Sequence, residues 1–271
     1  MLIDGKPADS ISVLDRGLQY GDGLFETISV IQGTPCLWQG HMARLESGCQ
    51  RLGIPTPDQE QLLTECRRVS EETDRCVVKI IITRGEGGQG YCPPQQPTPS
   101  RIVYRTTWPE RPEQWQTEGV KIRLCTTKLA SAPSFAGIKH LNRLPQVMAR
   151  SEWDDPDIAE GLMLDEQENV IEGTMSNLFL VTKGALLTPR LDRCGVAGVM
   201  RDKVIEVASN LGLPVTSAEI SLDTLRGAEA LFLTNSVVGI WPVKEVSGQT
   251  YDISAIDRRL LSQVMEQGFS F

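Results

Sequence analysis

The sequence predicts a mixed α/β fold in two parts, and three observations lead to this prediction. In the first part, segments with helical spacing of apolar residues alternate with segments of strand-like spacing. A polar stretch over 109–119, which contains two prolines, then breaks the pattern. The rest of the chain consists mainly of short strand-like segments between turn residues. We therefore expect a smaller N-terminal α/β domain over 1–108, a linker over 109–119 and a larger strand-rich domain over 120–271.

Two helices are expected in the first part. Residues 41–52 place apolar side chains on one face of a helix, and Gly53 is expected to end it. A second helix is expected to open at Thr56, which can cap it. Pro57 suits the first helical position, and Gln59 can complete a capping box.

Two strands and a long loop complete the first part. Residues 76–83 form a β-branched run that is typical of a buried strand, and 101–107 is its expected neighbour. The stretch between them, 85–100, is rich in Gly and Pro. Loops of this length in compact domains are usually functional, so we expect this loop to border a functional site.

The second part is expected to hold several strands and one long helix. Apolar and polar residues alternate over 120–124, which predicts a strand. Further strands are expected at 161–165, 170–172, 177–182, 185–188 and 230–234. The helix is expected to begin after Gly198 and to end at Gly212. Its inward-facing residues are expected to be Met200, Val204, Val207 and Leu211.

The composition argues against several classes of protein. A net charge of −8 does not provide the basic surface of a nucleic-acid-binding protein. Seven cysteines without a C-x-x-C pair, together with two histidines, give no metal-site pattern and no disulfide framework. The sequence has no apolar run of about 18 residues, and its N-terminus does not resemble a signal peptide. We therefore expect a cytoplasmic protein with free thiols that uses no metal, membrane or nucleic acid.

A lysine and a glutamate are candidates for cofactor chemistry. Lys139 lies among small and apolar residues, where an amine loses solvation, becomes nucleophilic and can form a Schiff base. Glu172 stands at the end of an expected strand, where its carboxylate could hold a proton on a pyridine nitrogen. Taken alone, each pattern is more typical of a solvated surface residue.

Three further features could hold a phosphate group. Gly198 precedes the expected helix, whose first N–H groups and dipole attract anions. Arg44 lies about 100° around its helix from the apolar face and could bind a phosphate with two N–H groups. Asn235 and Ser236 end an expected strand with polar side chains. Each feature alone also fits an ordinary helix start, a surface arginine or a polar strand end.

The order and spacing of these features resemble the signature of the class IV aminotransferase family of fold-type IV. The residues that carry the resemblance are Glu172, Thr174, Asn177, Leu178, Phe179, Leu186, Thr188, Val196, Gly198, Val199 and Arg201. The resemblance implies a pseudo-barrel in the larger domain, pyridoxal 5′-phosphate (PLP) as the cofactor, and a homodimer with the active site near the subunit interface.

The same resemblance implies a role for each candidate residue. Lys139 would carry PLP and act as acid and base, and Glu172 would pair with the pyridine nitrogen. The phosphate would be held by Arg44, the backbone N–H groups of Val199 and Met200, and Ser236, with Asn235 beside it facing the substrate.

Two segments, 83–91 and 137–144, resemble more narrowly the aminodeoxychorismate lyases, and 15–27 matches the N-terminal block of the class. Those enzymes convert 4-amino-4-deoxychorismate into 4-aminobenzoate and pyruvate in folate biosynthesis. Candidates for substrate binding, on motif position, are Arg84, Arg143, Tyr91 and Asn235. Gln89 stands where many relatives have a basic residue, which puts a carboxylate-binding role at that position in doubt.

Two alternatives stay open. A fold-type IV transaminase acting on D-alanine or branched-chain amino acids would use the same cofactor residues, although 83–91 and 137–144 favour the lyase. A dependence on a keto-acid acceptor separates the two. The second alternative is a non-catalytic protein of this fold that binds a ligand or regulates a partner, and the presence of Lys139, Glu172 and Arg44 argues against it.

Overall fold

The chain divides into two compact units. The structure is a computed structural model that describes residues 1–269. The first unit comprises Met1–Pro109 and Ile138–Asn142 with Phe269, and the second comprises Glu110–Gly137 and Arg143–Gly268. The segment with Lys139 therefore packs with the first unit, although it follows the expected linker in the chain. The assignment of 120–271 to one PLP-binding domain stays a prediction.

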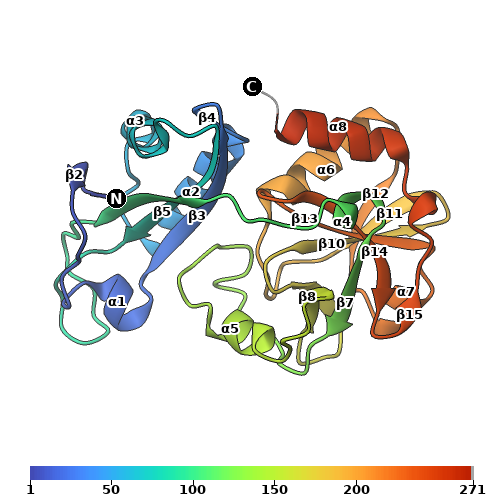
Figure 1. The fold of residues 1–271 in the computed structure, drawn as a ribbon. Helices are drawn as coiled ribbons and strands as arrows, with labels where there is room; N and C mark the ends of the chain where they lie inside the picture. Colours follow the sequence, from blue (N-terminus) through green and yellow to red (C-terminus); the bar gives the residue numbers. More distant parts are fainter. Residues whose placement is uncertain (270–271) are drawn as a thin grey trace. The chain divides into compact units, whose positions relative to one another are not determined.

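The first unit is a six-stranded antiparallel sheet in the order β2-β1-β6-β5-β3-β4. Its strands are β1 (Leu2–Ile3), β2 (Lys6–Pro7), β3 (Gly23–Ile31), β4 (Thr34–Pro35), β5 (Arg75–Thr83) and β6 (Arg101–Thr107), and its helices are α1 (Arg16–Tyr20), α2 (Trp38–Leu52) and α3 (Gln59–Ser70). Apolar side chains of α2 and α3, such as Leu45 and Leu62, pack with Ile80 of β5 in one core. The two longer helices therefore cover one face of this sheet (Figure 1).

Both predicted helices of the first part are present, and one cap differs from the prediction. Helix α2 begins at Trp38 and ends as predicted before Gly53, whose φ of 64° is left-handed and suits glycine. Helix α3 is capped by Asp58, which accepts a hydrogen bond of 2.8 Å from the backbone N–H of Gln61. The predicted cap at Thr56 is therefore wrong, because aspartate caps equally well and stands directly before the helix.

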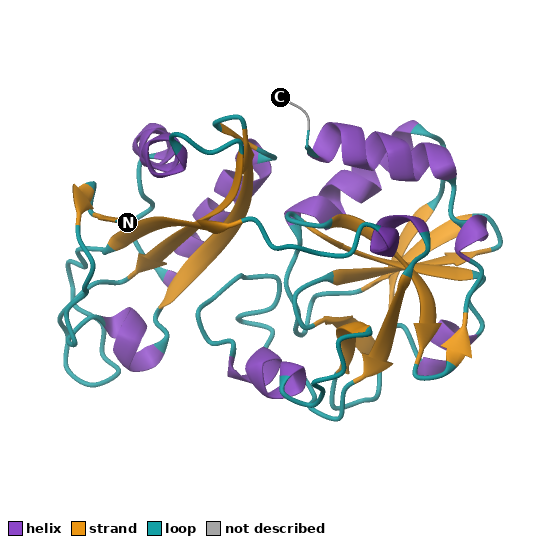
Figure 2. Cartoon of the chain, viewed as in Figure 1, coloured by secondary structure: helices purple, strands orange, loops and turns teal. Residues whose placement is uncertain are grey.

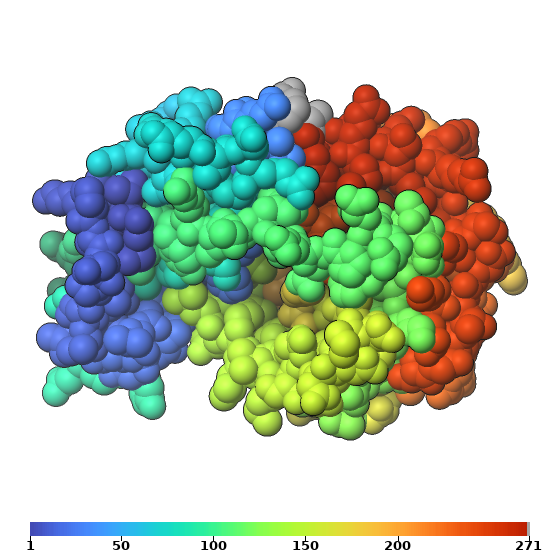
Figure 3. All heavy atoms as spheres, viewed as in Figure 1, coloured from blue at the N-terminus to red at the C-terminus, as the bar shows by residue number. Residues whose placement is uncertain are grey.

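The predicted neighbouring strands are β5 and β6, which pair antiparallel over most of their length. The loop between them is held by Arg16 of α1. The Arg16 guanidinium donates hydrogen bonds to the carbonyl oxygens of Gly87 (3.2 Å), Gly90 (2.9 Å) and Tyr91 (3.3 Å). This part of the loop therefore lies against α1 at the surface of the first unit (Figures 1 and 3).

The second unit is a strongly twisted nine-stranded sheet (Figure 2). Its strands are β7 (Val120–Leu124), β8 (Ile158–Leu164), β9 (Val170–Gly173), β10 (Asn177–Thr182), β11 (Ala185–Pro189), β12 (Val215–Ala218), β13 (Ala230–Asn235), β14 (Gly239–Val246) and β15 (Gln249–Thr250). Their order is β12-β11-β10-β13-β14-β7-β8-β9, with β15 beside β14. The pairs β14/β7, β7/β8 and β11/β12 are parallel, and the others are antiparallel. The predicted strand-rich α/β architecture is confirmed.

Helices cover part of the second sheet. They are α4 (Gln114–Thr117), α5 (Leu144–Arg150), α6 (Val199–Asn210), α7 (Leu222–Arg226) and α8 (Arg258–Gly268), with a short 3₁₀ turn η1 (Ile253–Ala255). Helices α6 and α8 pack against one another, α6 against β13 and α8 against β14. Helix α6 begins after Gly198 as predicted, and Met200, Val204 and Val207 are buried. Leu211 was expected to face inward, but it follows the last helical residue and is half-buried.

Three further findings concern residues 1–269. No helix in this range is long and apolar enough to cross a membrane. No group of three or more His, Cys, Asp or Glu side chains in the same range could hold a metal ion. All seven cysteines are free, and only Cys92 among them is exposed.

Candidate active site

Lys139 is held beside the first residues of β3. The Phe25 N–H donates to the Lys139 carbonyl oxygen (3.0 Å), and Leu24 forms a β-bridge with His140. Ile138 is 3% exposed and belongs to the core under α2, while Lys139 is half-buried. The Lys139 Nζ lies 4.5 Å from the centroid of the Phe25 ring. Because successive side chains of an extended backbone point to opposite sides, Ile138 points into the core and Lys139 points toward the Phe25 ring.

Arg44 is anchored by a buried carboxylate of β3. Its Nε donates to Glu26 Oε1 at 2.8 Å, and its Nη2 forms an ion pair with Glu26 Oε2. His41 Nδ1 lies 2.6 Å from the same Oε2. Burial alone would raise the pKa of Glu26, but attraction to Arg44 and the hydrogen bond with His41 outweigh it and lower this pKa to about 2. Glu26 is therefore ionised and fixes the orientation of Arg44.

His41 is neutral in this cluster. Burial lowers its pKa below the ordinary value of 6.5, although the hydrogen bond with Glu26 opposes this shift. A neutral His41 that faces a carboxylate must donate through Nδ1, which leaves Nε2 as an acceptor. Nε2 is buried and has no hydrogen-bond partner among residues 1–269. Arg44 is consequently the cation that pairs with Glu26.

Glu172 is placed by the last residues of β9. It is 4% exposed, and its Oε2 accepts a hydrogen bond of 2.8 Å from the Val196 N–H. Val196 lies in the segment that leads into α6. One carboxylate therefore links the end of β9 to the start of α6, which are the two elements that carry most of the family signature.

Glu160 of β8, which sequence analysis missed, organises the turn after Glu172. It is fully buried and accepts five hydrogen bonds, one of them from the adjacent Gly161 N–H (2.9 Å). The others come from Thr174 N–H (3.1 Å), Thr174 Oγ1 (2.5 Å), Met175 N–H (3.1 Å) and Ser176 Oγ (2.9 Å). The detectable signal was a charged residue within an apolar strand, because such a residue must find buried partners.

Asn235 joins this turn to the loop after β13. Its Nδ2 donates to the Met175 carbonyl oxygen at 3.2 Å. Its Oδ1 accepts from the N–H groups of Val237 and Val238, both at 2.9 Å. These contacts fix the conformation of the loop that contains Ser236, so that Asn235 has a structural role in addition to its predicted role at the phosphate.

The start of α6 has the features of an anion site. Gly198 is its N-cap and provides no side-chain cap, so the first N–H groups, including those of Val199 and Met200, are not capped by a side chain. The side chain of Asn177 lies against this helix start, and its Nδ2 donates to the Val196 carbonyl oxygen at 2.9 Å. A Cβ at Gly198 would lie 1.9 Å from Asn177 Oδ1, so this close approach requires glycine.

Two signature residues serve to hold α6 on the sheet. Arg201 donates from Nε to Thr188 Oγ1 (3.2 Å) and from Nη2 to Ser217 Oγ (2.8 Å). Thr188 Oγ1 in turn donates to the Leu178 carbonyl oxygen at 2.9 Å. Burial lowers the pKa of Arg201. Thr188 and Arg201 therefore connect β10, β11, β12 and α6.

The predicted substrate-binding residues of the first unit have other partners. Arg84 donates to both carboxylate oxygens of Asp22 (2.7 and 3.0 Å) and to the carbonyl oxygens of Leu52 (2.8 Å) and Gly53 (2.9 Å). Four of its five N–H groups are thus occupied, which weighs against its predicted role as a carboxylate ligand. Tyr91 is 87% exposed and packs edge-on against Tyr20, with centroids 5.5 Å apart.

Arg143 and Gln89, the two other positions discussed for substrate binding, lie in different surroundings. Arg143 is the N-cap of α5 and is half-buried. Gln89 lies in an exposed turn of the loop, where its backbone exchanges hydrogen bonds with Cys92 (3.2 and 3.1 Å). The loop therefore offers no cation at position 89.

The predicted site residues are distributed over both units. The first unit holds Lys139, Arg44, Arg84 and Tyr91, and the second holds Glu172, Val199, Met200, Asn235, Ser236 and Arg143. Within the second unit, Glu160, the 174–176 turn and Asn235 form one hydrogen-bonded chain. The roles of the individual residues toward a cofactor stay predictions.

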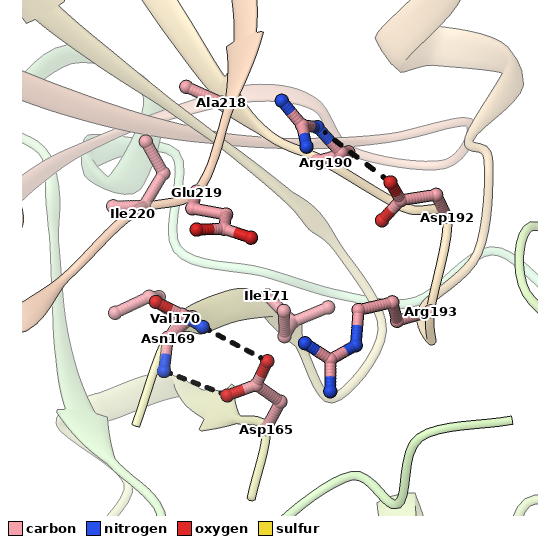
Figure 4. A pocket seen from close by; sticks show the side chains of 10 residues that line it. All are labelled: Asp165, Asn169, Val170, Ile171, Arg190, Asp192, Arg193, Ala218, Glu219 and Ile220. Carbon is pink, nitrogen blue, oxygen red and sulfur yellow. Dashed lines mark hydrogen bonds and ion pairs between the residues drawn. The ribbon is translucent and has the colours of Figure 1, made fainter. Parts of the chain in front are cut away.

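A small cavity of the second unit lies away from these groups. Figure 4 shows its lining, with the Asp165–Asn169 hydrogen bonds and the Arg190–Asp192 ion pair marked. Its volume of about 10 Å³ is at the lower limit for one water molecule. A larger groove of about 430 Å³ is lined by the β10–β11 hairpin, by the start of α8 and by the residues that precede it. Neither is lined by a predicted site residue, so the chemistry of the side chains and not the cavity size defines the candidate site.

Comparison with known proteins identifies the class. The chain matches the family model "Amino-transferase class IV" over residues 23–246, which is most of its length, and it belongs to that family. The resemblance drawn from the signature residues is confirmed.

Within this family, the chain is similar to lyases and to a transaminase. It is 37% identical to an aminodeoxychorismate lyase of Vibrio harveyi, covering 95% of this chain and 97% of the relative. It is 31% identical to a putative branched-chain-amino-acid aminotransferase of Methanocaldococcus jannaschii, covering 91% and 86%. The crystal structure of 4-amino-4-deoxychorismate lyase from Pseudomonas aeruginosa is 46% identical, covers 100% of this chain and 99% of its own, and superposes with a TM-score of 0.94. The predicted fold-type IV architecture is confirmed by this similarity.

Proposed function

We propose that this chain is a PLP-dependent lyase that converts 4-amino-4-deoxychorismate into 4-aminobenzoate and pyruvate, a step of folate biosynthesis. The observation that carries the proposal is the 46% identity to the Pseudomonas lyase over the full length of both chains. The similarity to the Vibrio lyase also exceeds that to the Methanocaldococcus aminotransferase.

The residues present fit PLP. An uncapped start of α6, with a glycine that Asn177 approaches too closely for any side chain, suits a phosphate group. Arg44, oriented by Glu26, would add a cation to the phosphate, and Ser236 a hydroxyl. Buried Glu172 is suited to pair with a protonated pyridine nitrogen, which stays charged beside a carboxylate. The bound cofactor would supply an electron sink for the carbon that bears the substrate amine.

Lys139 would move the protons of the reaction. Its Nζ would hold the cofactor and, once the substrate amine has taken its place, would accept the proton from the amine-bearing carbon. The same Nζ would then return a proton to the enolpyruvyl group as its C–O bond breaks. The ring of the substrate becomes aromatic, which makes the elimination hard to reverse.

The atoms of the reaction balance without a second substrate. One C–H bond and one C–O bond of the substrate break, and the departing enolpyruvyl group becomes pyruvate with the transferred proton. The two products together have the composition of the substrate. A lyase of this kind therefore requires no keto acid, whereas a transaminase does.

A transaminase of the same fold is the second candidate, because the Methanocaldococcus relative carries that description at 31% identity. Its cofactor residues would be the same. Amino transfer to a keto acid, in the absence of 4-aminobenzoate formation, would favour this candidate.

The test is a product assay. Purified holoenzyme is given 4-amino-4-deoxychorismate generated in situ without any keto acid, and 4-aminobenzoate and pyruvate are quantified together. We expect equal amounts of both products, none with Lys139→Ala, and the full amounts with Lys6→Ala, which removes an exposed lysine of the same unit. Lys139→Ala should also lack the visible absorbance of PLP that is bound covalently to a lysine. Formation of both products by Lys139→Ala would contradict the role of this lysine.

We further propose that the enzyme is a cytoplasmic homodimer. Large apolar side chains are exposed on α1 and the residues before it, and on α5. They are Val13 (73% exposed), Leu14 (58%), Leu18 (63%), Leu144 (67%), Val147 (58%) and Met148 (56%). Exposed apolar groups of this size are typical of surfaces that are covered by a partner. The seven free cysteines are compatible with a reducing compartment.

A further inference from the structure

The proposed substrate carries two carboxylates, and the predicted cations do not account for both. Position 89 is an uncharged glutamine, and Arg84 already donates four hydrogen bonds to Asp22 and to backbone carbonyl groups. Arg143 is the remaining predicted cation. Lys and Arg form the strongest hydrogen bonds with carboxylates, so a further cation close to Lys139 is the best candidate for the second carboxylate. The following inference rests on the proposed function.

Lys79 lies on the face of the first sheet opposite to α2 and α3. Its neighbours on β5, Val78 and Ile80, are fully buried in the core that contains these helices. Because successive side chains of a strand point to opposite faces, Lys79 points to the other face. There it is paired in register with Thr27 of β3 and Tyr104 of β6. All three side chains are half-buried.

The Phe25 ring connects Lys79 to Lys139. The Nζ of Lys79 lies 5.5 Å from the ring centroid, and the Nζ of Lys139 lies 4.5 Å from it. The sum of these distances, 10.0 Å, is the largest possible separation of the two nitrogen atoms. In 4-amino-4-deoxychorismate, only a six-membered ring or an enolpyruvyl ether separates the amine from each carboxylate, so the two lysines are near enough for one molecule of this size to contact both.

The charge of Lys79 has no acidic partner in the described chain. Within residues 1–269, no carboxylate oxygen lies within 4.0 Å of its Nζ. Its contact is with the face of Phe25, which does not neutralise a cation. A half-buried cation without a counter-ion attracts an anion more strongly than a fully solvated one.

We infer that Lys79 binds a carboxylate of the substrate while the substrate amine is at Lys139. Its Nζ donates a charge-assisted hydrogen bond to that carboxylate, and the Phe25 ring lies between the two ends of the bound molecule. Lys79 is thus a specificity-determining residue that favours a carboxylate held farther from the amine than in an α-amino acid.

Steady-state kinetics test this inference with three variants. Lys79→Gln removes the charge, and Lys79→Arg retains it. Arg75→Gln is the matched control, because Arg75 lies on the same strand with its guanidinium over the Trp108 ring, 4.2 Å from the centroid. We expect Lys79→Gln to raise KM about ten- to hundredfold, as for the loss of one charge-assisted hydrogen bond, with kcat retained. Lys79→Arg should recover most of the loss, and Arg75→Gln should match the wild type.

Cofactor loading separates this role from folding and from PLP binding. The PLP dissociation constant and the visible spectrum of Lys79→Gln should equal those of the wild type. An unchanged KM in Lys79→Gln, or a weakened PLP affinity that accounts for the whole loss, would overturn the inference.

A binding experiment makes the result independent of turnover. Chorismate retains both carboxylates but has a hydroxyl in place of the amine, so its affinity for the holoenzyme can be measured by calorimetry without reaction. We expect Lys79→Gln to bind it at least tenfold more weakly than the wild type and Arg75→Gln. Equal affinities, or no binding to the wild type, would overturn the inference about Lys79. Absence of 4-aminobenzoate in the wild-type assay, by contrast, would overturn the proposed lyase function alone.

Discussion

Two buried acidic residues, Glu160 within β8 and Asp165 directly after it, each hold a turn by accepting hydrogen bonds, but we expect different effects when they are replaced. Glu160 holds the 174–176 turn, which follows Glu172 and contacts Asn235. Asp165 holds the 165–169 turn by accepting hydrogen bonds from the backbone of Gln167 and Asn169. The two carboxylates therefore form a matched pair for separating stability from cofactor binding.

We expect Glu160→Gln and Asp165→Asn to lower the free energy of unfolding by similar amounts, about 1–3 kcal/mol, because each leaves buried donors without an acceptor. Only Glu160→Gln should also weaken PLP binding, by at least tenfold, since the turn it holds supports both Glu172 and the loop with Ser236. Absorbance titration with PLP and denaturant unfolding measure the two effects. Equal PLP affinities for both variants would contradict a positioning role of Glu160.

The Glu26 cluster predicts how stability depends on pH. The pKa of Glu26 is about 2 in the folded state and ordinarily 4.5, so its ionised form stabilises the fold above pH 4.5. This contribution, about 3 kcal/mol, is lost as the pH falls from 4.5 toward 2. The lowered pKa of His41 acts in the same direction, because the unfolded state takes up a proton first as the pH falls below 6.5.

We therefore expect the difference in unfolding free energy between the wild type and Glu26→Gln to be largest near neutral pH and to shrink below pH 4.5. Chemical denaturation at a series of pH values measures it. Arg101 pairs with Glu65 elsewhere in the same unit, so Glu65→Gln controls for the loss of a buried ion pair. A difference for Glu26→Gln that does not change with pH would contradict the lowered pKa.

At the scale of elements, the start of α6 combines a backbone anion site with side-chain anchors. Gly198 leaves room for Asn177, while Arg201 and Thr188 fix the first turn to the sheet. Among the signature residues of this region, Gly198 thus permits the close approach of Asn177, and Thr188 and Arg201 hold the helix start in this position. The N–H groups of the first turn are held in place before any ligand binds, which reduces the entropic cost of binding a phosphate.

Gly198→Ala is expected to weaken PLP binding more than it weakens the fold. The new Cβ would lie 1.9 Å from Asn177 Oδ1, so Asn177 or the helix start must move. Gly227→Ala is the control, since Gly227 also has a negative φ of −84° at a helix end and the nearest atom is 3.3 Å from its Cβ. PLP titration should show at least a tenfold loss for Gly198→Ala and none for Gly227→Ala. The same PLP affinity in Gly198→Ala as in the wild type would exclude the start of α6 as the phosphate site.

At the scale of the whole molecule, we expect a particle of twice the 29.9 kDa mass of one chain. Leu18→Asp, at a side chain that is 63% exposed on α1, should produce monomers if α1 lies in the subunit interface. Sedimentation velocity measures the mass, and Glu60→Lys on the exposed side of α3 controls for a change in charge. A monomeric wild type would contradict the proposed dimer.

The sequence predicted the elements with strong local patterns, and it did not predict contacts between distant residues. The β-branched run of β5 and the glycine after α2 are local signals, and both predictions are confirmed. Arg84 and Arg44 are examples of residues whose contacts the sequence did not predict. Their partners, Asp22 and Glu26, lie 62 and 18 residues away in the chain, so no local pattern reveals that these guanidinium groups are already bound. Glu160 carries a local signal, a charge within an apolar strand, but its partners in 174–176 belong to another strand connection and cannot be read from that signal.

The position of Lys139 in the first unit has a consequence for synthesis of the chain on the ribosome. When residues up to Pro109 have emerged, the edge of β3 at Gly23–Phe25 still lacks the partner that Lys139–Leu141 later provides. An unpaired strand edge can recruit the same edge of a neighbouring nascent chain. The segment that closes this edge is also the one that carries the cofactor lysine. Pairing of this strand edge and arrival of the reactive amine are therefore a single event during translation.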